Sequence, residues 1–286
     1  ILIMEIIDCH LHFSSIELFK KTAKERSKVD YSRIGLVKEL EESNIVKCIG
    51  MGLSETGTGK FPDADSVNPM RLDLEKIPSG VYSCLGINPV KLKFDRDKKE
   101  LADIESNISE KVVGLKIYPG YYPYKLTDSC YQQIYHLAEQ YQLPVVIHCG
   151  DTFCNKGHLS YSHPLEVNKI ALQHRDVDFV MAHFGNPWVI DAAMVISNNP
   201  NVYADLSGLL IGSEDEINNA DQLLINYVKT GFAYVSDYTK FFYGSDWPLV
   251  RMNSYISYIK KLIPEDYHQL VFYDNAAKVF QRLKYN

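Results

Sequence analysis

Eight short runs of mostly apolar residues, rich in β-branched and aromatic side chains, recur along the chain. Several are almost continuously apolar and do not alternate with polar residues, which is typical of strands buried on both faces of a parallel sheet. We therefore expect eight parallel strands. The runs span 5–13, 45–51, 80–88, 112–118, 144–149, 178–183, 201–207 and 241–246.

The segments between these runs have room for helices. Consecutive runs end 24 to 39 residues apart, which is enough for a crossover helix and two loops in each case. Apolar residues at helical spacing occur in several of the segments, and in one of them Ile34, Val37 and Leu40 form the stripe that we expect to be buried. The predicted helices lie in 31–43, 128–142, 186–199 and 274–283.

Eight strand–helix units in 286 residues predict an α/β protein of the (β/α)8 TIM-barrel type, whose usual length is about 250 residues. No Ser/Gly-rich linker or low-complexity tract separates the units. We therefore expect residues 1–286 to form a single domain.

Composition and charge narrow the range of partners. The chain is 46% hydrophobic and 23% charged, as in ordinary soluble proteins, and has no run of about 18 apolar residues that could span a membrane. Its net charge of −6, without a Lys/Arg cluster, argues against nucleic acids and anionic membranes as partners. We expect a small-molecule substrate, and the sequence is compatible with a homo-oligomer.

The spacing of the cysteines and the N-terminal residues of the sequence indicate the cellular compartment. The six cysteines are scattered without CxxC spacing, which fits reduced thiols better than a disulfide framework or a structural zinc site. The opening residues lack the basic leader and the small-residue cleavage site of a signal peptide. We therefore expect a cytoplasmic protein.

Polar side chains of an unusual kind stand where the predicted strands end. His10 and His12 end the first strand, His148 the fifth, His183 the sixth and Asp246 the eighth. The carboxyl ends of the strands meet at one face of a (β/α)8 barrel, where active sites lie. Because side chains alternate along a strand, His10 and His12 share a face and can converge on one ion. Histidine and aspartate ligands suit zinc or a similar divalent metal.

Each of these residues also has a plainer interpretation. A lone strand histidine such as His183 is more often a hydrogen-bonded core residue, and Asp246 before Trp-Pro is compatible with a turn. Independent structural histidines, however, have no reason to gather at the same end of different strands. Their combination therefore favours a functional site.

Lys116, at the end of the fourth strand, is compatible with three roles. It could bind a substrate carboxylate, become carboxylated and bridge two metal ions, or extend its ammonium group to water. Tyr118 and Tyr121 follow it and could stack on a flat substrate. Arg251 is another candidate partner for a carboxylate. His163, in the loop after the fifth strand, is a further candidate substrate-binding residue.

In their order along the chain, these landmarks resemble the amidohydrolase superfamily of metal-dependent barrels, in particular the branch that includes aminocarboxymuconate-semialdehyde decarboxylase. The resemblance covers almost the whole chain and implies a distorted barrel with a metal site at the carboxyl ends of the strands. It rests on DCHLHF, GLKIYPGYYPY, PVVIHCG, AHFGNPW, NPNVYADLSG, YGSDWP and NAAKVF.

The resemblance implies a specific ligand set. One divalent metal, commonly zinc, with manganese or another divalent ion as the alternative, would be held by His10, His12, His148 and Asp246. His183 would stay off this metal as an acid/base or polarising group. In binuclear relatives a lysine on the fourth strand is carboxylated and bridges two ions, which would make Lys116 and His183 ligands as well. The ligand positions fit both patterns.

Together, the residues and the resemblance predict a metal-dependent hydrolase. Metal-activated water would attack an ester, lactone or amide bond of a small, carboxylated or cyclic substrate. Asp246 would move the proton, His183 would polarise the carbonyl group, and Asp8 is a candidate acceptor for the second N–H of a metal-bound histidine.

Two other functions compete with hydrolysis. The first is non-oxidative decarboxylation of an unsaturated or aromatic carboxylic acid on the same residues. The second is a non-catalytic, ligand-binding barrel, which is disfavoured because all four metal positions and His183 are intact.

Overall fold

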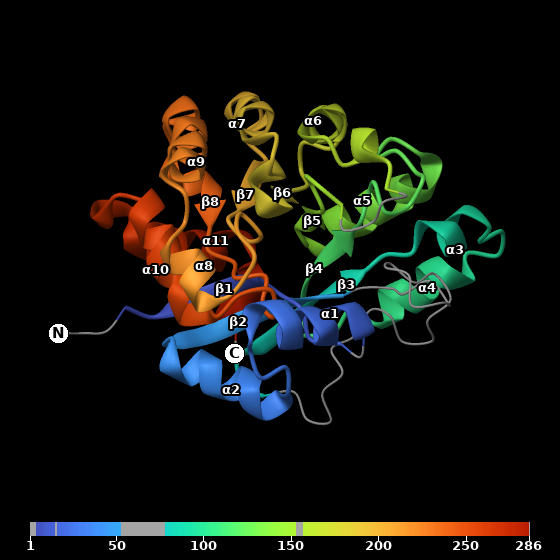
Figure 1. The fold of residues 1–286 in the computed structure, drawn as a ribbon. Coiled ribbons are helices and arrows are strands. Elements are labelled where there is room, and N and C mark those ends of the chain that lie inside the picture. Colours follow the sequence, from blue (N-terminus) through green and yellow to red (C-terminus); the bar gives the residue numbers. More distant parts are fainter. Residues whose placement is uncertain (1–3, 15, 53–77, 153–156, 286) are drawn as a thin grey trace.

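The computed structural model describes residues 4–14, 16–52, 78–152 and 157–285 and has the predicted barrel architecture (Figure 1). Eight parallel strands follow one another in the order of the chain, and each is hydrogen-bonded to the next. In the described part of the chain, no helix combines the length and the apolar character needed to cross a membrane.

Each strand lies within the apolar run that predicted it; all but β2 are shorter than their runs, and the last four lose the largest share. The first and fourth strands are buried along their whole length, which accounts for their nearly unbroken apolar sequences. The strands are β1 (Ile6–Leu11), β2 (Ile45–Met51), β3 (Val81–Gly86), β4 (Val112–Ile117), β5 (Val145–Ile147), β6 (Phe179–Met181), β7 (Val202–Asp205) and β8 (Phe241–Phe242).

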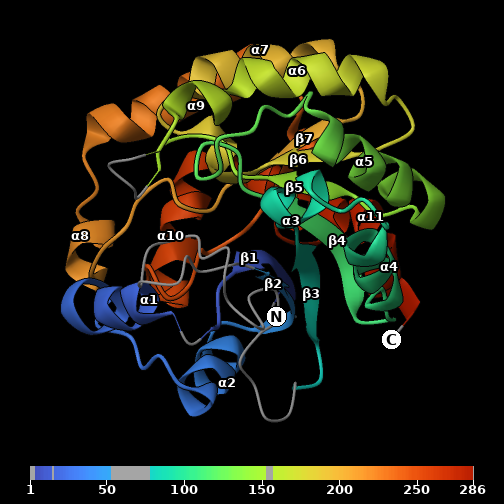
Figure 2. The ribbon, with the colours of Figure 1, turned by 90° about the vertical axis from the view of Figure 1, so that its right-hand side faces the viewer.

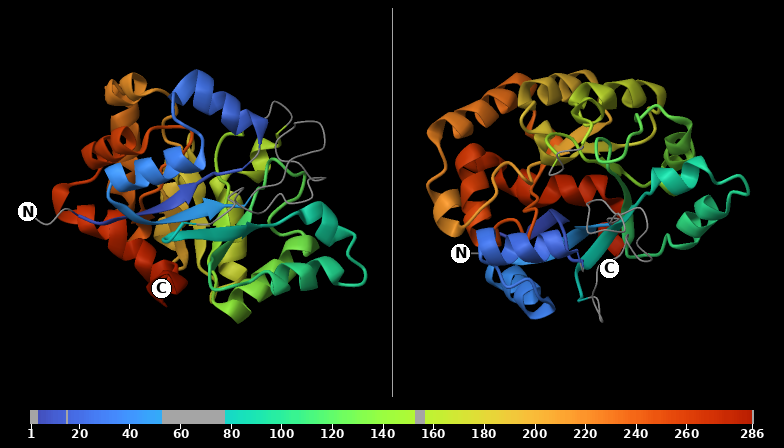
Figure 3. Two further views of the ribbon diagram at one scale, coloured as in Figure 1. Left: turned by 90° about the horizontal axis from the view of Figure 1, so that it is seen from below. Right: turned by 45° about the vertical axis from the view of Figure 1, so that its right-hand side comes forward.

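Helices surround the strands as an outer layer (Figures 1 and 2). Among them, α7 lies between α6 and α9, and α3 and α4 lie beside α5 (Figure 3). The helices are α1 (Glu17–Thr22), α2 (Arg33–Glu42), α3 (Pro89–Lys93), α4 (Lys99–Ser106), α5 (Ser129–Tyr141), α6 (Pro164–Gln173), α7 (Val189–Asn198), α8 (Glu214–Asn218), α9 (Gln222–Val235), α10 (Met252–Leu262) and α11 (Asn275–Val279).

The cysteines of the described part are buried and form no disulfide bond; they are Cys9, Cys48, Cys84, Cys130 and Cys149. Reduced thiols were expected from the sequence, and these side chains pack as small apolar groups in the core. Cys154 lies outside the described residues.

The buried face of α2 differs from the one that the sequence predicts. Ile34, at the start of the predicted stripe, is 75% exposed, whereas Leu36 and Glu39 are buried. On this face Leu36 packs in the apolar core with Leu40 beside it, and the Glu39 carboxylate accepts hydrogen bonds from the backbone N–H of Met252 (2.8 Å) and from Trp247 Nε1 (3.4 Å). The buried face of α2 therefore combines apolar packing with a polar contact to the last part of the barrel, which apolar periodicity alone does not predict.

Replacing Glu39 with alanine is expected to lower the free energy of unfolding by about 2 kcal/mol, because two buried N–H donors lose their acceptor. Urea unfolding measures this loss. Glu41, which is exposed on the same helix, provides the matched control, and Glu41→Ala should stay within about 0.5 kcal/mol of the wild type. Equal losses in the two variants would contradict the assigned contact.

The barrel closes between β1 and the segment that follows β8, where regular strand pairing has ended. The backbone N–H of Asp246 donates to the carbonyl of His10 (2.8 Å), and that of His12 donates to the carbonyl of Trp247 (2.7 Å). This closure brings Asp246 next to both histidines, although more than 230 residues separate them in sequence.

Candidate metal centre and active site

A cavity of about 160 Å³ lies at the carboxyl ends of the strands. Its lining includes the polar side chains that the sequence singled out on or after β1, β4, β5, β6 and β8, together with apolar side chains of α1 and of the loops after β7 and β8. The polar set is His10, His12, Lys116, Tyr118, Tyr121, His148, His183 and Asp246, and the apolar set includes Leu18, Phe19, Ile211 and Leu249.

Most of the polar set lies in turns beyond the strands and not on the strands themselves. His12 and His148 follow β1 and β5 directly, His183 lies two residues past β6, and Asp246 lies four residues past β8. His183 and Asp246 both have a φ of 61°, a left-handed conformation that periodicity along the sequence does not reveal. The strands therefore end earlier than predicted, and sharp turns place these side chains at the cavity.

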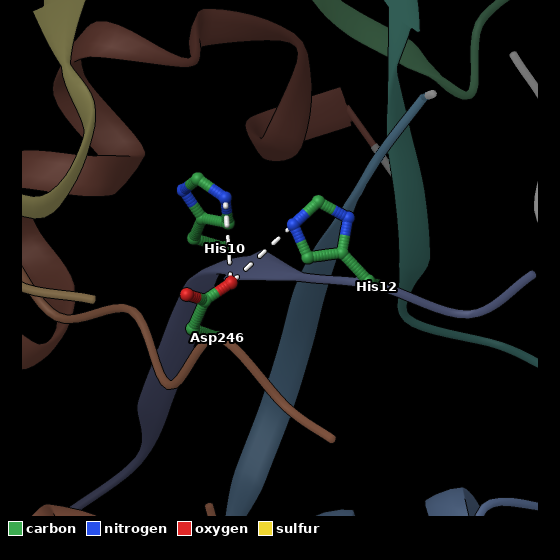
Figure 4. A group of neighbouring side chains, drawn as sticks. All are labelled: His10, His12 and Asp246. Atoms are coloured by element: carbon green, nitrogen blue, oxygen red, sulfur yellow. Dashed lines mark ion pairs between the residues drawn. The ribbon is translucent and has the colours of Figure 1, made fainter. Parts of the chain in front are cut away.

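One carboxylate oxygen of Asp246 faces ring nitrogens of His10, on β1, and of His12, directly after it (Figure 4). Oδ1 lies 3.3 Å from His12 Nε2 and 3.8 Å from His10 Nε2, and the three residues offer donor atoms within 4.8 Å of one another. All three side chains are buried. Such a compact set of nitrogen and oxygen donors is typical of a divalent metal site.

Several atoms of this cluster have no hydrogen-bond partner among the described residues. They include His10 Nε2, His12 Nδ1 and Asp246 Oδ1. Leaving buried polar atoms unpaired costs free energy, so an arrangement that gathers them requires an explanation. A metal ion bound by His10 Nε2 and Asp246 Oδ1 would supply the missing partner for these two atoms, and the residues therefore fit a metal.

Asp205, the last residue of β7, belongs to this site although the sequence analysis did not single it out. Its Oδ2 accepts a hydrogen bond from His10 Nδ1 (2.8 Å), which leaves the lone pair of His10 Nε2 available to a metal. Asp8, the predicted acceptor, instead binds the backbone N–H groups of His10 (3.1 Å) and Ser245 (3.0 Å). Asp205 could have been found as a polar residue near the end of the predicted strand 201–207.

The carboxylates of Asp205 and Asp246 are both held in their ionised form. Burial alone would raise the pKa of each, but the surrounding histidines outweigh it and keep both pKa values below the usual range. His10 contributes most for Asp205, and His183 contributes most for Asp246. Ionised carboxylates can bind a cation and accept a proton, as the predicted chemistry requires.

His148 lines the cavity but is not part of the compact donor cluster around Asp246. Its Nε2 lies 3.0 Å from the carbonyl oxygen of Asp151, and a neutral imidazole that donates from Nε2 carries its lone pair on Nδ1. Burial lowers the pKa of His148 well below its usual range, with a smaller contribution in the same direction from nearby Lys116, and keeps the ring neutral. Nδ1 is thus the atom that His148 can offer to a metal.

Lys116 is fully buried on β4, and its Nζ has no hydrogen-bond partner among the described residues. Burial lowers its pKa to about 8, against the opposing influence of Asp205 and Asp246. Of the three roles considered, extension to water is excluded, because the side chain is 0% exposed. Its Nζ lies 5.0 Å from the centre of the Tyr118 ring, but a buried ammonium group without a hydrogen-bond acceptor is still costly, which favours a role toward something that enters the cavity.

Comparison with known proteins gives the family. The model described as Amidohydrolase matches residues 94–282. The chain belongs to this amidohydrolase family. The matched part contains Lys116, His148, His183 and Asp246, and the HxH pair precedes it. The family resemblance predicted from the sequence is thereby confirmed, whereas a search of curated proteins found no match.

Solved structures show the same fold as this amidohydrolase. They include an uncharacterized TIM-barrel protein from Bordetella bronchiseptica (16% identity, TM-score 0.73, covering 98% of this chain and 100% of that chain). A probable 2-pyrone-4,6-dicarboxylic acid hydrolase from Acinetobacter baumannii is also similar (16% identity, TM-score 0.65, covering 97% of this chain and 100% of that chain). 5-Carboxyvanillate decarboxylase from Sphingomonas paucimobilis is similar as well (13% identity, TM-score 0.62, covering 98% of this chain and 99% of that chain). At these identities, the likeness establishes the fold as a TIM barrel.

Two predicted substrate-binding residues of the amidohydrolase are not in the described cavity lining. Arg251 precedes α10 and forms an ion pair with Glu214 (3.4 Å). His163 caps α6, where its Nδ1 accepts a hydrogen bond from the backbone N–H of Leu165 (3.3 Å). Both side chains thus have local structural contacts. Arg251 is close to Asp246 in sequence, and His163 lies in the loop after the fifth strand. Neither position in the sequence brings the side chain into the cavity.

Gly208 of the amidohydrolase lies against two side chains of the candidate site. It has a φ of +60°, and a Cβ atom there would lie 2.6 Å from His183 Nδ1 and 2.9 Å from Asp246 Oδ2. Gly208→Ala is therefore expected to displace these side chains, to lower the free energy of unfolding by about 1–3 kcal/mol and to reduce bound metal. Urea unfolding and metal analysis measure the two effects.

Gly212 offers a matched control for this substitution. It also has a positive φ, but the atoms nearest to a Cβ there belong to the Glu216 side chain and not to the candidate metal site. Gly212→Ala should therefore cost stability without changing the metal content. An equal loss of metal in both variants would show that backbone strain, and not the contact of Gly208 with His183 and Asp246, is responsible.

Proposed function

We propose that this amidohydrolase is a metal-dependent hydrolase that cleaves an ester, lactone or amide bond in a small, carboxylated or cyclic substrate. The observation that carries the proposal is the buried cluster of His10, His12 and Asp246. Donor atoms of this cluster lack hydrogen-bond partners among the described residues, in a cavity that also holds the Lys116 ammonium group, which has no hydrogen-bond acceptor there.

The proposed cofactor is one divalent ion, with zinc favoured and manganese as the alternative, because imidazole and carboxylate ligands suit both. His10, His12 and Asp246 would hold it, and His148 would add Nδ1. A second group of donor atoms, on His10, His183 and Asp205, is also compact. There, however, the His10 Nδ1–H already donates to Asp205, which favours one ion over two.

A bound divalent ion would acidify water and polarise a substrate oxygen. Asp246 is ionised and buried beside the cavity, where it would accept the proton of the attacking water and pass it to the leaving group. His183 would exchange a proton with the substrate. Lys116 would bind a substrate carboxylate, and Tyr118 and Tyr121 would flank a flat ring.

Non-oxidative decarboxylation is the second candidate, and Lys116, whose buried Nζ has no hydrogen-bond partner among the described residues, is the observation that keeps it open. A buried cation that is free to receive a carboxylate suits a carboxylic acid substrate equally well in both reactions. One of the similar structures carries the name of a decarboxylase and another that of a probable hydrolase. The same residues are therefore compatible with both activities.

Metal analysis of the purified protein, combined with a product assay, tests the proposal. We expect about one ion per chain, loss of this ion in His10→Ala, and cleavage of cyclic or aromatic carboxylated lactones and esters. His174→Ala, a histidine bonded to Gln132 on the outside of the barrel, is the control and should keep the metal. Release of carbon dioxide without bond hydrolysis would establish the decarboxylase.

A different result would support the non-catalytic alternative. If the protein contained no ion and gained no thermal stability from added zinc or manganese, the cluster would not be a metal site. That result would favour the non-catalytic, ligand-binding barrel.

A further inference from the structure

A chain of hydrogen bonds connects His183 to the proposed metal ligand His10. Ser207 Oγ lies 2.9 Å from His183 Nδ1 and 2.5 Å from Asp205 Oδ1. The other oxygen of Asp205, Oδ2, lies 2.8 Å from His10 Nδ1. Ser207 and Asp205 are buried, so these groups are bonded to one another and not to bulk water.

The direction of each bond follows from the chemistry of Asp205. An ionised carboxylate only accepts hydrogen bonds. Asp205 Oδ1 also accepts from the backbone N–H groups of His183 (3.0 Å) and Ser207 (3.1 Å), which stabilise its negative charge. The single hydroxyl proton of Ser207 must therefore point to Asp205, and toward His183 the serine oxygen can only accept. The proton in that contact belongs to His183 Nδ1.

We propose that Ser207 is a positioning residue that holds His183 in the Nδ1–H tautomer, so that Nε2 presents its lone pair to the cavity. In this form His183 accepts a proton from whatever the cavity binds before it can donate one. The inference deepens the proposed function, and its catalytic meaning rests on that function, because it states which nitrogen of His183 a substrate meets.

No other described group competes for His183 Nδ1 at hydrogen-bond distance. Asp246 Oδ2 is 3.8 Å away, which is too far for a hydrogen bond. The turn that carries Ser207 is also held in place from outside the barrel. The Tyr255 hydroxyl donates to the carbonyl of Leu206 (2.7 Å) and accepts from the backbone N–H of Leu209 (3.0 Å). The serine is thus fixed on both sides.

The experiment measures directly which ring nitrogen of His183 carries the proton. Protein labelled with ¹⁵N-histidine is studied by long-range ¹H–¹⁵N correlation spectra at neutral pH, with and without added zinc, and His183→Gln assigns the signals. In the wild type we expect a protonated Nδ1 and an unprotonated Nε2 for His183. Ser207→Ala should lose this preference and give a mixture of tautomers or the Nε2–H form.

Two further variants control for general effects of substitution. Ser207→Thr keeps the hydroxyl group and should keep the Nδ1–H pattern. Ser254→Ala removes another buried hydroxyl group, on α10, and should also leave the pattern unchanged. An Nε2–H signal in the wild type would overturn the inference, whether or not the variants fold. So would an unchanged Nδ1–H pattern in Ser207→Ala.

The spectra do not depend on turnover. The tautomer inference can therefore fail while the protein still binds metal and hydrolyses a substrate. Conversely, the inference can hold in a protein that proves to have neither property, which keeps the two tests distinguishable.

Discussion

Asp246→Asn is expected to reduce turnover about a thousandfold and to release most of the bound metal, while the barrel stays folded. The amide keeps the shape of the carboxylate but removes the charge that faces His10 and His12 at 3.8 and 3.3 Å. It also removes the proton acceptor. Elemental analysis and product formation measure the two losses, and circular dichroism confirms the fold.

Asp215 provides a charge-matched control for this experiment. It is exposed on α8, away from the described cavity lining, so Asp215→Asn should retain metal and activity. Full activity in Asp246→Asn would rule out the proposed role of this carboxylate in both hydrolysis and decarboxylation.

Lys116→Met should have opposite effects on stability and activity. Methionine fills a similar volume without a charge, so the free energy of unfolding of the metal-free protein is expected to rise by about 2 kcal/mol at neutral pH. Activity should be lost, because the substrate or the metal would lose its buried partner. Urea unfolding and product formation test the two effects.

The stability gain should depend on pH in a defined direction. The pKa of Lys116 is about 8 in the folded protein, below its ordinary value of 10.5, so between these values the unfolded chain binds more protons. Wild-type stability therefore rises with pH across this window. The advantage of Lys116→Met should be greatest below about pH 8 and vanish near about pH 10.5.

Lys229 is exposed on α9, and Lys229→Met is the control that should change stability by less than about 0.5 kcal/mol. A loss of stability in Lys116→Met would mean that the lysine has interactions in the resting protein that outweigh the cost of its burial. Carboxylation, the remaining alternative to binding a substrate carboxylate, would be such a case.

The fold could be predicted from the sequence because strands buried on both faces consist of nearly continuous apolar residues, which stand out from the segments between them. All eight strands lie within their predicted runs, and the alternation along β1 places His10 and His12 together. Strand ends were less predictable. His183 and Asp246 owe their positions to left-handed turns, which depend on backbone conformation and not on apolar spacing.

The errors at the site share a physical cause, which is that barrel neighbours are distant in sequence. Asp8 is two residues from His10, yet the imidazole bonds to Asp205, 195 residues away. Arg251 is five residues from Asp246, yet it pairs with Glu214. Local pattern identifies the residue types of a site, whereas the partner of each side chain is decided by contacts between strands and helices.

The closure between β1 and the segment after β8 has a mechanical consequence. The barrel wall there lacks a regular ladder and is joined by separate backbone contacts. Two of the proposed ligands, His10 and His12, stand on one side of this seam, and Asp246 stands on the other. An ion bound by all three would link the two sides of this closure and stabilise it. Chelation should therefore speed amide hydrogen exchange there first, before the rest of the wall loosens.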